Sequence, residues 1–185
     1  VYRGVVTAPL LTAAAVDAAA RVFADVLPPT PLHRSDRLSA ATGAEVWLKR
    51  EDLQPVRSYK LRGAFNFIAG LSDEERAKGV VAASAGNHAQ GVAFAGQRLG
   101  VGARIYLPRN TPRQKRDRVA ALGGDLVEVI VTGEVYDDAA TAAAQDAAHT
   151  GAVVVPAFDA LDTMAGQGTV ANEIVAQLGP VSYTH

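Results

Sequence analysis

Along the chain, short apolar runs of strand length alternate with segments in which apolar residues have helical spacing. The boundaries between these two patterns mark the expected strands and helices. Short runs of strand length cover residues 45–48, 79–83, 101–107, 126–131 and 152–155. Between these runs, apolar residues recur at intervals of three and four, which is typical of amphipathic helices. Continuous apolar strands that alternate with helices indicate right-handed βαβ units. We therefore expect an α/β fold in which parallel strands carry helices on both faces.

Capping residues mark where the helices begin and end. Ser58 precedes a helix that Gly70 ends, and Ser72–Glu75 has the pattern of a capping box. The apolar face of the helix after Ser58 has the spacing i, i+3, i+4, i+7 and consists of Leu61, Ala64, Phe65 and Ile68. Further helices are expected over residues 11–26, 87–99, 112–122, 134–149 and 161–178.

Two of these helices carry more specific expectations. Thr111 is expected to cap the helix that follows it, with Pro112 at the first helical position. The final helix is closed by Gly179 and Pro180. Its apolar residues at helical spacing are Val170, Ile174, Val175 and Leu178.

Composition and charge narrow the class of protein. The 185 residues and 19.2 kDa suit one α/β domain or two small lobes. A formal net charge of −1 gives no general electrostatic attraction to nucleic acid or to an anionic membrane, so we expect neither as a partner. The absence of Cys excludes disulfides, thiolate metal sites and thiol catalysis, and it fits a reducing, cytoplasmic location. Four scattered His residues without an i, i+4 pair predict no metal site.

The segment Ser84–Gly91 is the first candidate site, because it follows an apolar strand and opens a helix. The N–H groups at a helix N-terminus attract anions, and Gly86 lets a ligand approach the backbone closely. Ser84, Asn87 and His88 add polar side chains. The alternative is an ordinary strand-to-helix turn with an Asn cap. The dinucleotide pattern G-x-G-x-x-G does not occur in the chain.

Lys60 is the second candidate, because it lies in the first turn of a predicted helix. The positive end of a helix disfavours an ammonium group, and a neutral amine is what Schiff-base chemistry requires. The alternative is a solvated surface lysine. The neighbouring charge run Lys49–Asp52 is interpreted as a solvated strand end.

Taken together, four segments resemble the fold type II pyridoxal 5′-phosphate (PLP) enzymes, the tryptophan synthase beta-like fold. Within that group the sequence is most similar to threonine dehydratase (threonine ammonia-lyase), beside serine racemase and serine dehydratase. The resemblance covers residues 22–178, and its motifs occur in the family's order and spacing. The segments that carry it are Leu48–Gln54, Ser58–Ala64, Ser84–Gly91 and Ala165–Thr169.

The resemblance implies a role for each motif residue. Lys60 matches the lysine that binds the cofactor covalently and then takes the Cα proton of the amino acid. Tyr59 matches a ring position, usually Phe, close to the cofactor plane, and Asn87 would hydrogen-bond the 3′-hydroxyl of PLP. The substrate carboxylate would be held by Ser84, Ala85, Gly86 and His88, with Gln167 as a further contact.

The activity implied by the resemblance is α,β-elimination from L-threonine, which yields 2-oxobutanoate and ammonia and belongs to isoleucine biosynthesis. Serine racemase remains an alternative, because Ser84 matches the position of a second acid/base residue in relatives that racemise. The family also implies a homo-oligomer. Its lobes would be a small mobile lobe of residues 76–155 and a large lobe of residues 1–75 and 156–185.

The family's Gly-rich loop for the PLP phosphate has no counterpart in this chain. We therefore expect the chain to be an N-terminal fragment of the catalytic domain, starting at Val1 either as a fragment or through a GTG start codon. Residues 182–185 depart from the family pattern, so they are interpreted as non-native sequence. The alternative reading is a non-catalytic fragment that binds little or no cofactor. Such a chain should expose apolar surface and self-associate.

Overall fold

The structure, a computed structural model, describes residues 10–179. A parallel sheet of four strands lies at the centre of the larger part of this chain. Its spatial order is β5-β4-β3-β6. The strands are β3 Val80–Ala83, β4 Ala103–Leu107, β5 Val127–Val131 and β6 Val153–Val154. Every neighbouring pair is parallel, with Val80 aligned to Ala103 on one side and to Val153 on the other. The predicted α/β class with a parallel sheet is confirmed.

Helices cover both faces of this sheet. On one face, Val81 of β3 packs with Ala139 and Ala143 of α7 (Tyr136–Thr150). On the other face, Val80 and Ala82 belong to the core that includes α5 (Asn87–Leu99) and Val119 of α6 (Arg113–Gly123). Successive residues of a strand point to opposite faces, so β3 contributes to both clusters.

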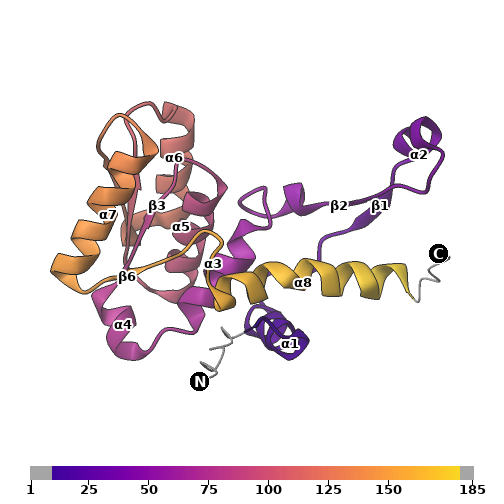
Figure 1. Ribbon diagram of the computed structural model, residues 1–185, viewed down its shortest axis with the longest axis horizontal. Coiled ribbons are helices and arrows are strands. Elements are labelled where there is room, and N and C mark those ends of the chain that lie inside the picture. Colours follow the sequence, from indigo (N-terminus) through magenta and orange to yellow (C-terminus); the bar gives the residue numbers. More distant parts are fainter. Residues whose placement is uncertain (1–9, 180–185) are drawn as a thin grey trace, which may run out of the picture.

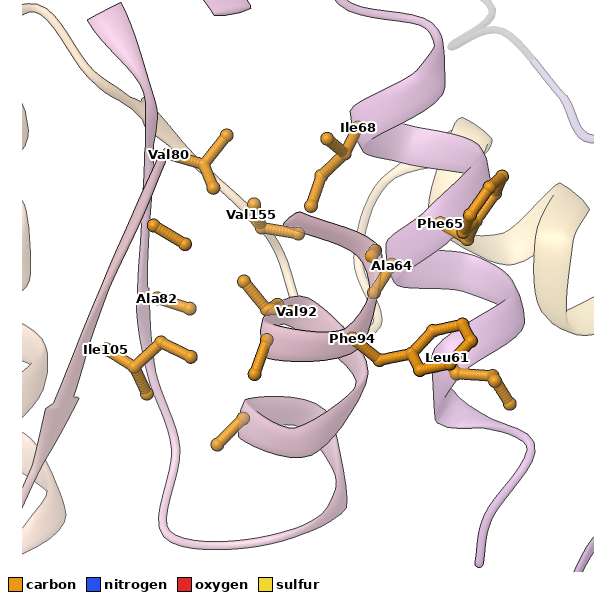
Figure 2. Packing of buried hydrophobic residues seen from close by; sticks show 14 of the residues in the cluster. Leu61, Ala64, Phe65, Ile68, Val80, Ala82, Val92, Phe94, Ile105 and Val155 are labelled. Carbon is orange, nitrogen blue, oxygen red and sulfur yellow. The ribbon is translucent and has the colours of Figure 1, made fainter. Parts of the chain in front are cut away.

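Helix α3 (Lys60–Ala69) forms a second layer outside α5. The predicted apolar face is confirmed, because Leu61, Ala64, Phe65 and Ile68 are all buried. Figure 2 shows Ile68 and Ala64 on the side of α3 that faces β3 and α5, whereas Phe65 lies on the other side of the helix, where its ring packs edge-on against that of Phe23. The long helix α8 (Leu161–Leu178) packs against α3, and α1 (Ala13–Val22) packs against α8. Helix α4 (Asp73–Lys78) begins with the expected capping box between Ser72 and Glu75.

An arm extends from this body beside the C-terminal half of α8 (Figure 1). It consists of β1 (Leu32–Arg34) and β2 (Trp47–Lys49), which pair antiparallel, with α2 (Asp36–Thr42) between them. The strand predicted over residues 45–48 starts two residues earlier than β2 and ends one residue earlier, and β1 and α2 were not predicted. Two turns of helix are too short to show a hydrophobic period, and Ser35 was the only local signal for the cap of α2.

Short 3-10 turns follow β2 at Glu51–Leu53 and precede β5 at Gly124–Leu126. Helix α6 begins at Arg113, and Pro112 is its extended N-cap residue, so the expectation that Pro112 is helical was wrong by one position. The Thr111 side chain makes no capping hydrogen bond to α6.

No described helix is both long and apolar enough to cross a membrane. The interpretation of residues 182–185 lies outside the described residues.

The buried face of α8 is not the stripe of large apolar residues that the sequence singles out. The residues of α8 that are buried are Thr163, Ala165, Gly166 and Thr169. Val175 is instead 64% exposed. The backbones explain this, because a Cβ at Gly166 would lie 2.5 Å from the carbonyl oxygen of Arg62. Helices that approach this closely leave room only for small side chains at the contact.

Candidate functional site

Two loops meet at the carboxyl ends of neighbouring strands. The turn Ser84–Gly86 follows β3, and the segment 155–160 follows β6 and leads into α8. In open parallel sheets, ligands bind outside the carboxyl ends of the strands. Both segments therefore lie where this fold places its ligand sites.

The turn after β3 presents backbone donors at the start of α5. The Ser84 hydroxyl accepts a hydrogen bond from the Gly86 N–H at 3.2 Å, which closes the turn. No side chain caps α5, whose first helical residue is Asn87, and the first N–H groups of a helix have no partner within it. Asn87 is exposed, while Ser84, Ala85 and Gly86 are half-buried. The arrangement suits an anion such as a carboxylate.

Lys60 lies at the start of α3, as predicted, and its amine is held rather than solvated. The Nζ atom donates to the carbonyl oxygen of Ala157 at 2.9 Å and lies 5.6 Å from the centre of the Tyr59 ring. The Ser58 hydroxyl accepts from the Lys60 N–H at 3.1 Å. The residue is half-buried, so the alternative of a solvated surface lysine was wrong.

His88 is buried and faces the segment after β6. Its Nε2 atom lies 2.9 Å from the carbonyl oxygen of Val155, and only 5% of the residue is exposed. A carbonyl can only accept, so Nε2 carries the proton. Burial lowers the pKa of His88 and the nearby Lys60 charge adds to the decrease, while the bond to Val155 opposes it. Nδ1 has no hydrogen-bond partner among the described residues.

Three consecutive carbonyl groups, which we call the 155–157 strap, connect these motifs. Val155 accepts from His88, Pro156 accepts from the Thr163 hydroxyl at 3.3 Å, and Ala157 accepts from Lys60. The donors come from α5, α8 and α3. The strap thus brings the motif around Lys60 and the motif around Ser84 to one place, as the sequence analysis expected of two parts of one site.

Glycine at position 91 allows the two motif helices to touch. A Cβ there would lie 3.1 Å from both the Lys60 carbonyl oxygen and the Leu61 Cα. Few real Cβ atoms approach so closely, so a larger residue would push α5 away from the first turn of α3. The Ser84–Gly91 motif therefore ends in a glycine that allows α5 to pack closely against α3.

Gln167 lies at the contact between α8 and α3. Its Oε1 atom accepts from the Gly63 N–H at 3.3 Å, and its Nε2 atom is buried with no partner among residues 10–179. A Cβ at Gly63 would lie 2.4 Å from that Nε2. Gln167 thus contributes to the contact between α8 and α3, and its contact with a substrate carboxylate stays a prediction.

A buried charge cluster beside this site was missed by the sequence reasoning. Arg62 makes ion pairs with Glu51 and with Glu173 of α8, and Glu173 also pairs with Lys49. The interpretation of Lys49–Asp52 as a solvated strand end was therefore wrong for Lys49 and Glu51, whose side chains are 7% and 11% exposed. The available signal was Arg62 itself, which lies next to Leu61 on the apolar side of α3 and so requires buried acidic partners.

Two further features complete the surroundings. An apolar pocket of about 240 Å³ lies on the α7 side of the strap, and its walls include Ala83, Tyr136, Val154, Pro156 and Phe158. Among residues 10–179, no group of three or more His, Asp or Glu side chains converges in a way that could hold a metal ion.

Comparison with known proteins gives a consistent result. The family model described as "Pyridoxal-phosphate dependent enzyme" matches residues 23–184. L-threonine dehydratase biosynthetic IlvA of Mycobacterium tuberculosis is 60% identical over 168 residues, which cover 91% of this chain and 39% of that protein. The protein of the same name from Corynebacterium glutamicum is 55% identical over 171 residues, or 92% of this chain and 39% of that one.

Solved structures show the same likeness. The processed form of threonine deaminase isoform 2 from Solanum lycopersicum superposes with a TM-score of 0.80 at 43% identity, over 90% of this chain and 49% of that one. Maize serine racemase superposes with a TM-score of 0.84 at 33% identity, over 89% of this chain and 49% of that one. The chain thus spans about half of these solved chains and 39% of the length of the curated relatives named above.

Proposed function

Because the chain belongs to the pyridoxal-phosphate dependent enzymes, we propose that it is the lysine-bearing part of a dehydratase that acts on L-threonine. The proposed reaction releases 2-oxobutanoate and ammonia and serves isoleucine biosynthesis. The 60% identity to a biosynthetic L-threonine dehydratase supports this choice of substrate. The observation that carries the proposal is the convergence of Lys60 and the Ser84–Gly91 motif on the 155–157 strap.

The residues present fit part of the cofactor. PLP needs an amine for its aldehyde, and Lys60 offers one in a half-buried position. The exposed Asn87 amide can reach a ligand outside the start of α5, in keeping with a bond to the 3′-hydroxyl of PLP. The Tyr59 ring lies beside the Lys60 amine, in keeping with a place near the cofactor plane.

Bound PLP supplies the electron sink that makes the Cα–H bond of an amino acid acidic. We propose that Lys60 accepts this proton at Nζ while the β-hydroxyl group leaves. The uncapped N–H groups at the start of α5, with Ser84, Ala85 and Gly86, orient the substrate carboxylate. His88 contributes its backbone N–H, because its ring N–H is engaged by Val155.

Substitution of the lysine tests this proposal. In the full product of the gene, we expect Lys60→Ala to abolish the absorbance band of covalently bound PLP and the production of 2-oxobutanoate. Lys115→Ala, which removes an exposed lysine on α6, is the matched control and should retain both. Persistence of the band in the Lys60→Ala protein would sink the assignment of Lys60.

Serine racemisation is a second candidate, supported by the superposition on maize serine racemase and by Ser84 at the end of β3. Incubation of the full gene product with L-serine and L-threonine, followed by chiral chromatography, separates the two. We expect 2-oxobutanoate from L-threonine to be the main product. D-serine as the main product, lost in Ser84→Ala, would favour the racemase.

The 185-residue chain needs its own measurement. We propose that it binds PLP weakly, because it lacks a counterpart of the family's phosphate-binding loop. Titration of the chain with PLP tests this, and tight binding would contradict it. The same proposal includes two lobes, a small mobile lobe of residues 76–155 and a large lobe of residues 1–75 and 156–185. It also includes homo-oligomeric assembly and a cytoplasmic location.

A further inference from the structure

Arg62 lies at the centre of a buried charge cluster two residues after Lys60. Its Nε and Nη2 atoms donate to the two carboxylate oxygens of Glu51 at 2.9 and 2.8 Å, a bidentate pair. Its Nη1 atom donates to Glu173 at 2.6 Å and to the Thr169 hydroxyl at 3.1 Å. We call Arg62, Glu51, Glu173, Lys49 and Thr169 the Arg62 cluster.

The cluster is shielded from water and its charges balance. The Arg62 side chain is 0% exposed, and those of Lys49, Glu51 and Glu173 are at most 15% exposed. Lys49 closes the set through its ion pair with Glu173, which gives two positive and two negative charges. Burial opposes the charge of Arg62, yet its bonds to Glu51 and Glu173 raise its pKa.

This set of bonds joins the elements that surround Lys60. Glu51 lies in the 3-10 turn after β2, Arg62 in the first turn of α3, and Glu173 in α8. The first turn of α3 has no side-chain cap from its N-cap residue Tyr59. Ser58 and Gln167 accept hydrogen bonds from the Lys60 and Gly63 N–H groups of this turn. Arg62 adds four side-chain hydrogen bonds, which connect the turn to the 3-10 turn after β2 and to α8.

Stability alone gives a poor account of such a cluster. Buried ion pairs are often no more stabilising than well-packed apolar residues of similar size. An apolar residue cannot reproduce the fixed direction of a guanidinium group that binds a carboxylate through two parallel bonds. What the cluster adds over apolar packing is a defined rotation of the first turn of α3.

We propose that Arg62 is a positioning residue for Lys60. The cluster holds the first turn of α3 so that the Lys60 amine reaches the 155–157 strap and stays in place for the cofactor. This inference rests on the proposed role of Lys60. The position of the amine can nevertheless be measured without cofactor or substrate.

The test uses the full product of the gene, freed of cofactor. Lys60 is modified with trinitrobenzenesulfonate, and the rate of labelling of the Lys60 peptide is followed by mass spectrometry. Arg62→Lys keeps the charge and removes the bidentate bond. The matched control is Arg104→Lys, because Arg104 makes a similar bidentate pair with Asp146, at 2.6 and 3.1 Å, where α7 meets β4.

We expect Arg62→Lys to label Lys60 roughly fivefold faster than wild type, as the loss of a hydrogen bond of about 1 kcal/mol implies. The affinity for PLP should fall by about 10- to 150-fold, because a charge-assisted hydrogen bond is worth about 1.5–3 kcal/mol. Arg104→Lys should leave both quantities unchanged. Labelling and PLP affinity that stay at wild-type values in Arg62→Lys would make the cluster purely structural and overturn the proposal.

Thr169→Val covers the case in which Arg62→Lys does not fold. It removes one acceptor from Arg62 and keeps all four charges. Faster labelling of Lys60 in the folded Thr169→Val protein supports the positioning role, and unchanged labelling overturns it. If the wild-type protein takes up no PLP at all, the proposed function fails, whereas the labelling experiment still tests the role of Arg62.

Discussion

A lysine in the first turn of a helix is an unfavourable choice for stability, and the structure shows what offsets it. The positive end of α3 repels the ammonium group of Lys60. The Ala157 carbonyl oxygen accepts a hydrogen bond from that group at 2.9 Å, and the Tyr59 ring lies beside it. The Lys60 amine is thus held against a neighbouring loop, in keeping with the reactive role proposed for it.

His88 makes the stability of the protein depend on pH. Burial lowers its pKa in the folded state, so the unfolded chain binds a proton that the folded protein does not. The stabilisation is present above the unfolded pKa of about 6.5 and is lost as the pH falls below it. We expect the free energy of unfolding, measured with urea at several pH values, to decrease as the pH is lowered from 7.5 towards 5.5.

Replacing the imidazole tests its share in this decrease. His88→Gln should flatten the pH dependence, because glutamine does not titrate in this range. His149→Gln is the matched control at an exposed position of α7 and should keep the wild-type slope. An unchanged slope in His88→Gln would show that other groups cause the loss of stability.

Close contact between helices, rather than large apolar side chains, determines the packing of α3 against α8. Gly166 faces the backbone of α3, where an added Cβ would lie 2.7 Å from the Gly63 Cα. Gln167 and Thr169, on either side of this contact, bind Gly63 and Arg62. The motif Gly166–Thr169 therefore joins the helix of Lys60 to α8.

Gly166→Ala should separate these helices. We expect it to lower the free energy of unfolding by about 1–3 kcal/mol, as overpacking of a close contact does. Gly102→Ala is the control, because a Cβ there meets no atom within 4 Å. Urea unfolding of both variants gives the comparison, and equal stability of the two would show that α3 and α8 separate without cost.

At the scale of the whole molecule, the described chain leaves apolar residues uncovered. Trp47 of β2, Leu53 and Val175 of α8 are 41%, 55% and 64% exposed. The two-stranded sheet β1-β2 is not joined to the four-stranded sheet, and such isolated pairs are marginally stable in water. Exposed apolar residues of this kind favour association.

We therefore expect the 185-residue chain to self-associate. Sedimentation velocity over a range of concentrations should show species larger than the 19.2 kDa monomer. Val175→Lys should weaken the association, because it places a charge on the exposed side of α8. Thr141→Lys adds the same charge at an exposed position of α7 and should have no effect. A monomer at every concentration would contradict the expectation.

Local signals in the sequence determined most of the elements and both motifs. The apolar face of α3, the capping box at Ser72 and the limits of α5 and α8 depend on residues within a few positions of each other. The resemblance to a family also predicted that Lys60 and Ser84–Gly91 belong to one site. Alternating strands and helices predicted the parallel sheet for the same local reason.

Only the tertiary structure decided which groups those residues bind. Lys60 and Ala157 are 97 positions apart, and Arg62 and Glu173 are 111 positions apart. No local preference specifies such partners, because they depend on how α3 and α8 cross. The same crossing turned Gly166 inward and left Val175 exposed, against the hydrophobic pattern. The hydrophobic period of a helix indicates which of its residues can be buried. The distance between the backbones of α3 and α8 decides which of them are buried.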